Sequence, residues 1–350
     1  MRRKDIKSMT RSELSDEIAQ LGLPSFRTDQ IFDWLQARGV VSFDEMTNLP
    51  KTLRTQLSET FEVRSCTVVR RLVSQDETVK YLFRLIDGEC VESVLMKYKY
   101  GYTLCVSSQV GCKMGCAFCA STLGGFVRSL TASEILSQIH AAQRDRNVRV
   151  SHVVLMGMGE PLDNFDNVMR FLDLASADKG LNISMRNISL STCGLVPRIY
   201  DLMRRKYQLT LSISIHAPND EIRSRIMPVS RRYPMEELLK ACRAYADATG
   251  RRISFEYTMI RGVNDSDACA RELAGRLRGM LAHVNLIPAN EFSESPYARS
   301  STDTVERFAE TLRKNGVNAT IRRSLGSDID ASCGQLRLHS QKEVGPHDSI

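Results

Sequence analysis

Residues 104–121 of the chain read LCVSSQVGCKMGCAFCAS. The apolar run Leu104–Val106 is typical of a buried strand, and the segment after it carries Cys112, Cys116 and Cys119 in a C-x3-C-x2-C spacing. Cysteines at such short spacing are typical of metal ligands in proteins of reducing compartments. A strand followed by a thiol-rich loop therefore predicts a metal site at the C-terminal end of the first strand of an α/β domain, where such folds hold their functional residues.

Strand-like and helix-like segments alternate from this stretch onward. Six further apolar, β-rich runs follow, at 153–156, 188–192, 209–215, 253–260, 284–287 and 319–322. Amphipathic patterns separate them, and one of these begins with the capping-box pair Thr131 and Glu134. Repeated βα units with right-handed crossovers build a parallel sheet. We therefore predict an α/β protein whose main domain is a partial (β/α)6-type TIM barrel.

The residues before the thiol-rich stretch follow two other patterns. Residues 10–62 contain three short helical patterns, the first of which Ser12 can cap, and residues 66–102 contain short β-like runs with a hairpin signal at Asp87-Gly88. The predicted organisation is an N-terminal helical accessory domain over 1–65, linker β-strands over 66–97, the barrel core over 98–336 and a polar tail over 337–350.

Composition narrows the class of protein. The 350 residues are 42% apolar and 25% charged, and no stretch approaches the ~18 consecutive apolar residues of a membrane span. The basic N-terminus is not followed by an apolar segment, so we expect no secretory signal. Ten cysteines are too few for a disulfide scaffold, which favours a cytoplasmic protein. The net charge of +7 favours an anionic partner such as nucleic acid.

Three thiols in one short segment favour an iron–sulfur cluster over structural zinc. Structural zinc normally takes four ligands, and neither a second cysteine pair nor a histidine lies close to this segment in the sequence. Three thiolates suit a 4Fe–4S cluster whose fourth iron is open to another ligand. Cys105 leaves an alternative open, because it is near enough in sequence to be a fourth ligand. Its position on a strand argues that it faces the barrel interior instead.

The cysteine spacing, with Phe118 before the last thiol, resembles the signature of the radical S-adenosylmethionine (SAM) superfamily. Longer runs resemble the RlmN/Cfr family of radical SAM adenine methyltransferases, namely residues 104–121 above, MGMGEPLDN (156–164), LSISIHAPND (211–220), HVNLIPAN (283–290) and LGSDIDASCGQL (325–336). The resemblance extends from Leu49 to Leu336. It implies one 4Fe–4S cluster, held by Cys112, Cys116 and Cys119, and the use of two SAM molecules per turnover.

The resemblance also implies a reaction. The expected product carries a methyl group on carbon 2 of adenosine 2503 in the peptidyl-transferase centre of 23S rRNA, or of adenosine 37 in tRNA. Carbon 2 of adenine is electron-poor and does not attack the SAM methyl group, so the cofactor must supply a radical. The N-terminal helical unit resembles the family's accessory RNA-binding domain. We expect an electron donor such as a flavodoxin system and a monomeric enzyme.

Three residues acquire catalytic roles through this resemblance. Cys333 is the implied methyl carrier, which forms a covalent protein–RNA adduct. Cys105 is implied to release the product by attacking the Cys333 sulfur, which leaves a disulfide that must be reduced. Glu92 is the implied acceptor of the ring proton. From local pattern alone, Glu92 is a solvent-facing strand residue and Cys333 an ordinary loop thiol.

The SAM-contacting positions implied by the family fall at the ends of successive predicted strands. Gly159 and Glu160 are implied to hold the aminoacyl end of SAM. The other implied contacts are Ser191, Ser214, Ile215, His216 and Asn290.

Two alternatives remain open at this stage. A Cfr-type enzyme would methylate carbon 8 of the same ribosomal adenosine and confer antibiotic resistance. A non-enzymatic RNA-binding protein would instead hold a structural metal on Cys105, Cys112, Cys116 and Cys119. Substitution of Cys105 separates the second alternative from the enzyme.

Overall fold

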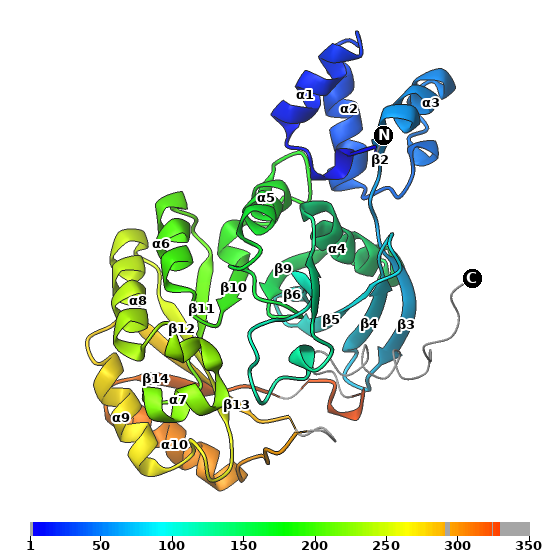
Figure 1. Ribbon diagram of the computed structural model, residues 1–350. Coiled ribbons are helices and arrows are strands. Elements are labelled where there is room, and N and C mark those ends of the chain that lie inside the picture. The colour runs from blue at the N-terminus through cyan, green and yellow to red at the C-terminus, as the bar shows by residue number, and fades with distance from the viewer. Residues whose placement is uncertain (1–2, 291–294, 324, 330–350) are drawn as a thin grey trace.

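The computed structural model describes residues 3–290, 295–323 and 325–329, and one ten-stranded sheet organises them (Figure 1). Along the sheet the strands are β14 (Asn318–Ile321), β13 (Ala282–Pro288), β12 (Ile253–Met259), β11 (Thr210–Ser214), β10 (Ile188–Thr192), β9 (Val150–Leu155), β6 (Gly101–Cys105), β5 (Cys90–Tyr98), β4 (Val79–Arg84) and β3 (Thr67–Val73). The strands from β6 to β14 are parallel, whereas β3 to β6 pair antiparallel. The sheet is open at β14 and β3, which confirms the predicted partial barrel.

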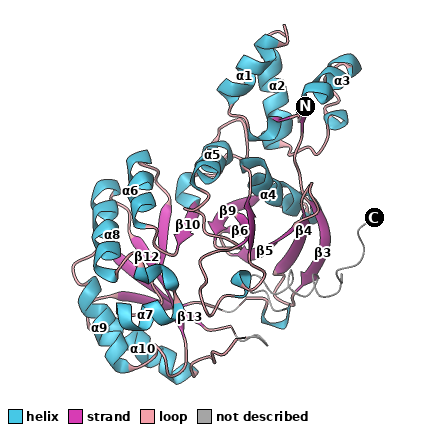
Figure 2. Ribbon diagram, in the orientation of Figure 1, coloured by secondary structure: helices cyan, strands magenta, loops and turns pink. Residues whose placement is uncertain are grey.

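Helices in the crossovers cover the outer face of the parallel strands (Figure 2). They are α4 (Ala132–Arg146), α5 (Phe165–Ser176), α6 (Val196–Arg205), α7 (Asp220–Ile226), α8 (Met235–Thr249), α9 (Asp267–Leu277) and α10 (Thr302–Lys314). The predicted capping box opens α4, because Thr131 Oγ1 accepts the Glu134 N–H and Glu134 accepts the Thr131 N–H. The apolar face of α5, with Val168, Phe171 and Leu172, is fully buried against the sheet core. Amphipathic periodicity therefore sets which face of each helix meets the strands.

The N-terminal helices project beyond one end of the barrel, at the top of Figure 1. They are α1 (Arg11–Gln20), α2 (Phe26–Phe32) and α3 (Lys51–Thr60), and α2 continues as a π-type segment over Asp33–Ala37. The short strands β1 (Lys4–Asp5), before α1, and β2 (Phe61–Glu62), after α3, pair in parallel and close the unit. The expected Ser12 cap is wrong. Thr10 caps α1 instead, because its hydroxyl accepts the Glu13 N–H while the Glu13 carboxylate accepts the Thr10 N–H.

The helical unit meets the barrel along α4. Ser133 Oγ donates to Asp5 Oδ2 at 2.6 Å, and His140 Nε2 lies 2.9 Å from the Gln36 carbonyl oxygen. Strands β3–β5, between this unit and the parallel strands, belong to the same sheet as β6. Among the described residues, no helix combines the length and apolar character needed to cross a bilayer.

Candidate active site

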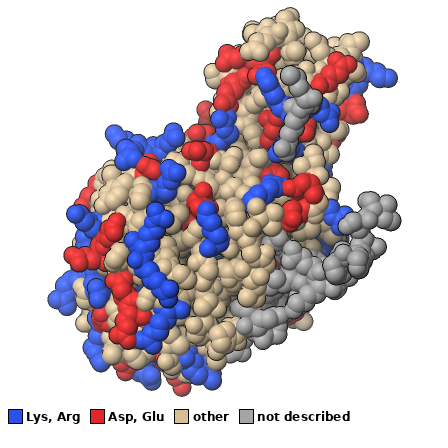
Figure 3. All heavy atoms as spheres, viewed as in Figure 1, with Lys and Arg blue, Asp and Glu red and all other residues tan. Residues whose placement is uncertain are grey.

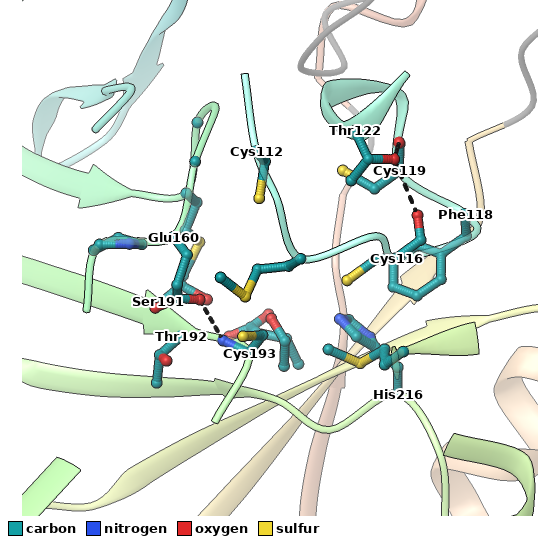
Figure 4. Close-up of a pocket in the computed structure, with 18 of the residues that line it drawn as sticks. Cys112, Cys116, Phe118, Cys119, Thr122, Glu160, Ser191, Thr192, Cys193 and His216 are labelled. Atoms are coloured by element: carbon teal, nitrogen blue, oxygen red, sulfur yellow. Dashed lines mark hydrogen bonds between the residues drawn. The ribbon is translucent and has the colours of Figure 1, made fainter. Parts of the chain in front are cut away.

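A cavity of about 210 Å³ lies at the C-terminal ends of the parallel strands (Figure 4). Its walls come from the cysteine segment after β6, from the glycine-rich turn after β9 and from the ends of β10 and β11. The sequence predicts functional residues at this rim, because parallel strands bring the loops that follow them to one edge.

All three clustered cysteines, Cys112, Cys116 and Cys119, line this cavity. The segment begins on the short hairpin β7 (Gln109–Gly111) and β8 (Phe126–Ser129). Gly111 adopts φ +73°, and a Cβ there would lie 1.7 Å from the Gly125 carbonyl oxygen, so only glycine fits. The Cys112 N–H donates to that same Gly125 oxygen at 3.2 Å. The hairpin therefore fixes where the first thiol enters the cavity.

The donor set fits a cluster better than a single metal ion. Within the described ranges, no three His, Cys, Asp or Glu side chains converge on one metal position. A 4Fe–4S cluster instead takes each thiolate on a different iron, so its ligands line a cavity without converging. Burial raises the pKa of Cys112 to about 12 and also raises that of Cys116. Metal binding must displace these thiol protons.

Cys105 lies outside the cavity lining, so its placement does not support a four-cysteine metal site. It ends β6, is buried, and packs with Val94, Met96 and Leu325 in a separate apolar cluster.

The turn after β9 brings a buried carboxylate to the cavity. Gly159 has φ +100°, and a Cβ there would lie 2.6 Å from the side chain of Gln109. Glu160 is 3% exposed, and its oxygens accept the N–H groups of Cys193 at 2.7 Å and Leu162 at 3.0 Å. Burial raises the pKa of Glu160 even though these hydrogen bonds favour the carboxylate. A buried carboxylate at a cavity wall suits a cationic ligand group such as an ammonium.

Three of the remaining implied SAM positions, Ser191, Ser214 and His216, line the cavity. His216 has φ +50°, its Nδ1 accepts the Thr258 N–H at 2.9 Å, and its ring stands edge-on to Phe118 with centroids 4.8 Å apart. Burial lowers the pKa of His216 to about 3, so the ring is neutral and carries its proton on Nε2.

Ile215 and Asn290 are not part of the cavity lining. Ile215 is fully buried and Asn290 is exposed. Their roles in SAM binding stay predictions.

Glu92 is completely buried on β5, so the solvent-facing expectation from alternation is wrong. Ser93 faces α4, where its hydroxyl donates to Gln138 at 2.8 Å. Glu92 therefore faces the opposite side of the sheet, which it shares with Val94 and with Cys105, the cross-strand partner of Val94. Lys80 Nζ lies 3.3 Å from Glu92 Oε2, and the two side chains are 1% and 0% exposed. Alternation fails here because both faces of β5 are covered.

Cys333 lies outside the described residues, but the chain that leads to it is described as far as Ile329. Leu325 packs in the cluster of Cys105. The Gly326 N–H donates to Asp76 at 2.9 Å, and Asp328 accepts the Gln75 N–H at 3.1 Å. The turn between β3 and β4 therefore anchors this segment on the Cys105 side of the barrel.

Comparisons with known proteins agree with this geometry. The radical SAM superfamily model matches residues 106–271, and the ribosomal RNA large subunit methyltransferase N-terminal domain model matches residues 4–63. Proteins named probable dual-specificity RNA methyltransferase RlmN from Desulforamulus reducens and Clostridium novyi are 52% and 51% identical to this chain. Each alignment covers 95% of this chain, with 95% and 98% of the relative, respectively. The chain belongs to the RlmN family.

A solved structure extends the RlmN-family likeness to three dimensions. The radical SAM methyltransferase from Sphaerobacter thermophilus superposes with a TM-score of 0.91 at 46% identity, covering 95% of this chain and 98% of that one. As a radical SAM methyltransferase, this RlmN-family chain uses a 4Fe–4S cluster and SAM.

Sequence reasoning missed three buried residues of this RlmN-family site. Lys80 contacts Glu92, Cys193 lines the cavity and donates its N–H to Glu160, and Arg223 donates to carbonyl groups at the ends of β10 and β11. Of these three residues, only Lys80 has a signal in the sequence. A lysine in the apolar run Val79–Arg84 indicates a charged partner, because a charged side chain is rarely buried without one. The other two act through backbone groups, which no side-chain pattern reveals.

Proposed function

We propose that this protein methylates carbon 2 of adenosine 2503 in 23S rRNA and of adenosine 37 in tRNA. The observation that carries the proposal is one cavity at the strand ends that joins the three cysteines to Gly159 and Glu160. The dual-specificity names of the RlmN relatives supply the substrate class. Carbon 8, the Cfr-type position, is the competing product.

Cys112, Cys116 and Cys119 hold the cluster, and the turn at Gly159 and Glu160 receives the aminoacyl end of SAM. When bound and reduced, the cluster supplies the electron that cleaves SAM to a carbon-centred radical. Neutral His216 and Ser214 line the same cavity, where uncharged hydrogen-bonding groups orient a ligand without competing for its charges.

Cys333 carries the methyl group that becomes bonded to the target adenine, and Cys105 resolves the adduct. The Cys105 thiolate attacks the Cys333 sulfur and forms a disulfide, while the bond between that sulfur and the methylene carbon breaks; its electron pair stays with the carbon, which takes up a proton and becomes the methyl group of the product. The packing of Leu325 with Cys105 supports this pairing, since it brings the chain that leads to Cys333 beside the resolving thiol.

Glu92 accepts the proton that the adenine ring loses as it regains aromaticity. Its contact with Lys80 supports this role, because a buried ammonium whose nitrogen lies 3.3 Å from Glu92 Oε2 holds the carboxyl group in place on the Cys105 side of the sheet. Glu92 and Cys105 face the same side of the sheet, as a base and a resolving thiol that act on one adduct must.

RNA binding and chemistry belong to different parts of the chain, which consists of the N-terminal unit over residues 1–65, the linker strands over 66–97 and the core over 98–336. Basic side chains supply salt-dependent affinity for the RNA backbone, and Figure 3 shows a run of them over the part of the molecule that contains α6, α7 and α8. The target base leaves its stack to reach the cavity. A flavodoxin-type donor reduces the cluster, and the enzyme acts as a cytoplasmic monomer.

Nucleoside mass spectrometry tests the proposal. Reconstituted protein, SAM and reductant are incubated anaerobically with 23S rRNA fragments or tRNA, and the digests are compared with 2-methyladenosine and 8-methyladenosine standards. We expect 2-methyladenosine from both RNAs. The 8-methyl isomer identifies a Cfr-type enzyme, and neither product from protein with an intact cluster overturns the substrate assignment.

A further inference from the structure

Arg223 on α7 is a fully buried arginine beside the active-site cavity, and the reaction outlined above leaves it without a role. Its Nη2 donates to the carbonyl oxygens of Cys193 at 2.6 Å and Ser214 at 3.2 Å, and its Nε donates to that of Ile215 at 3.1 Å. These oxygens belong to the ends of β10 and β11, where the cavity lies. The guanidinium therefore ties α7 to two strand ends of the site.

The hydrogen-bond partners of the Arg223 guanidinium are backbone carbonyl oxygens, which carry no net charge. Among the described residues it forms no ion pair, and its Nη1 is buried without a hydrogen-bond partner. Burying a cation on neutral carbonyls alone is costly for folding, so a site with an anionic group nearby is the setting that offsets it. Two groups that interact with the Arg223 charge can carry a negative charge, the Asp220 carboxylate and the sulfur of Cys116 once it is a thiolate ligand of the cluster.

A short chain of contacts connects Arg223 to the cluster ligands. At the C-terminal end of α7, the Ile226 carbonyl accepts the Ala117 N–H at 2.9 Å, next to Cys116. Ile226 and Met227 pack in the same apolar cluster as Cys116 and Cys193. Movement of α7 would therefore move the cysteine segment relative to the strand ends.

A second chain of contacts leads to the SAM side. Cys193 donates its N–H to Glu160, while its carbonyl accepts from Arg223. One residue of the β10 loop is thus held from both sides, and its position sets that of the Glu160 carboxylate.

We propose that Arg223 is a positioning residue that holds the cysteine segment and the SAM-binding strand ends in one arrangement, and that its charge stabilises the extra negative charge of the one-electron-reduced cluster. The electron comes from an external one-electron donor, and no bond to Arg223 forms or breaks. The proposal rests on the cluster and SAM assignments of the proposed function, but not on the RNA substrate.

Two variants and a matched control test it. Arg223→Met removes the charge and all three hydrogen bonds, whereas Arg223→Lys keeps the charge and loses the planar fork. The control is Arg225→Met, on the same helix, where the arginine is exposed and paired with Glu221. After anaerobic reconstitution, each protein is examined for iron content, for cluster midpoint potential by dithionite titration followed by electron paramagnetic resonance, and for SAM affinity without RNA.

We expect Arg223→Met to shift the midpoint potential to more negative values and to weaken SAM binding by at least ~10-fold. Arg223→Lys should keep a potential close to wild type but still bind SAM less tightly, and Arg225→Met should match wild type in both. A purely structural role does not predict that the midpoint potential depends on the charge of residue 223 while the SAM affinity depends on its hydrogen bonds.

A wild-type potential and SAM affinity in Arg223→Met overturn the proposal. Where Arg223→Met does not retain iron, Arg223→Lys decides: weaker SAM binding at a wild-type potential supports the proposal, and wild-type values in both overturn it. Because neither measurement involves RNA, a wrong choice of methylated carbon leaves the outcome unaffected.

Discussion

Replacing Lys80 with methionine removes the ammonium group that lies 3.3 Å from the Glu92 carboxylate. Both side chains are fully buried, in neighbouring strands β4 and β5, so water cannot replace the lost charge. Methionine keeps the length and apolar stem of lysine. The substitution therefore tests the charge of the pair rather than the packing around it.

The geometry sets the size of the effect. At an effective dielectric constant of about 20, two unit charges 3.3 Å apart attract each other by about 5 kcal/mol. Breaking a buried pair by removing one partner costs about 3–5 kcal/mol of folding stability. The ammonium also holds the Glu92 carboxyl group in place, and a displaced carboxyl group accepts the proton of the adduct less readily. We therefore expect Lys80→Met to lose stability and to accumulate the covalent protein–RNA adduct at pH 7.

Urea denaturation measures the loss of stability, and gel separation of protein-linked RNA in single-turnover reactions measures the adduct. Lys97→Met is the matched control. Lys97 and its partner Glu77 lie on the surface, with side chains 46% and 58% exposed, so this variant should keep a stability close to wild type. Wild-type release at pH 7 without adduct would refute the reasoning.

Three further expectations follow from other parts of the molecule. Cys105→Ala should keep its iron and accumulate the adduct, whereas loss of iron would restore the four-cysteine alternative. Gly111→Ala should fold but lose iron binding, because its Cβ meets the Gly125 oxygen, while Gly262→Ala, at a similar φ of +69° in open space, should retain iron. Burial lowers the pKa of Lys7 from its ordinary value of 10.5 to about 8. Between these two pH values the unfolded chain holds more protons than the folded one, so the free energy of unfolding should rise with pH by up to about 3 kcal/mol. Urea denaturation of Lys7→Met should show higher stability at pH 7 and a smaller rise, and an unchanged rise would contradict this origin.

Local patterns were sufficient for the parallel sheet. The run predicted over 188–192 is β10, and that over 253–260 matches β12 to within one residue, because buried parallel strands are continuous apolar runs with clear ends. The same patterns did not fix the first residue of α1, since Thr10 and Ser12 are both good N-cap residues. The Glu three residues after Thr10 decides between them, through a reciprocal pair of hydrogen bonds.

Residues whose role depends on distant parts of the chain were not predictable. Alternation placed Glu92 in solvent because a pattern of period two cannot reveal that a second layer covers the sheet. The resemblance to a family, not the residues themselves, assigned its chemistry. Arg223 gave no signal, because its acceptors are carbonyl oxygens of strands that the fold brings beside α7.

Glu160 and Arg223 show why backbone groups matter so much in this site. A buried carboxylate and a buried guanidinium ordinarily pair, and the pair would then attract neither a cation nor an anion. Here they bind the N–H and the carbonyl of Cys193, so that the backbone of one residue stands between them. In the arrangement that we propose, each charge is directed at a different ligand, Glu160 at the ammonium group of SAM and Arg223 at the cluster held by Cys116. We therefore expect the cavity to bind a cationic cosubstrate next to an anionic cluster, because the two protein charges do not pair with each other.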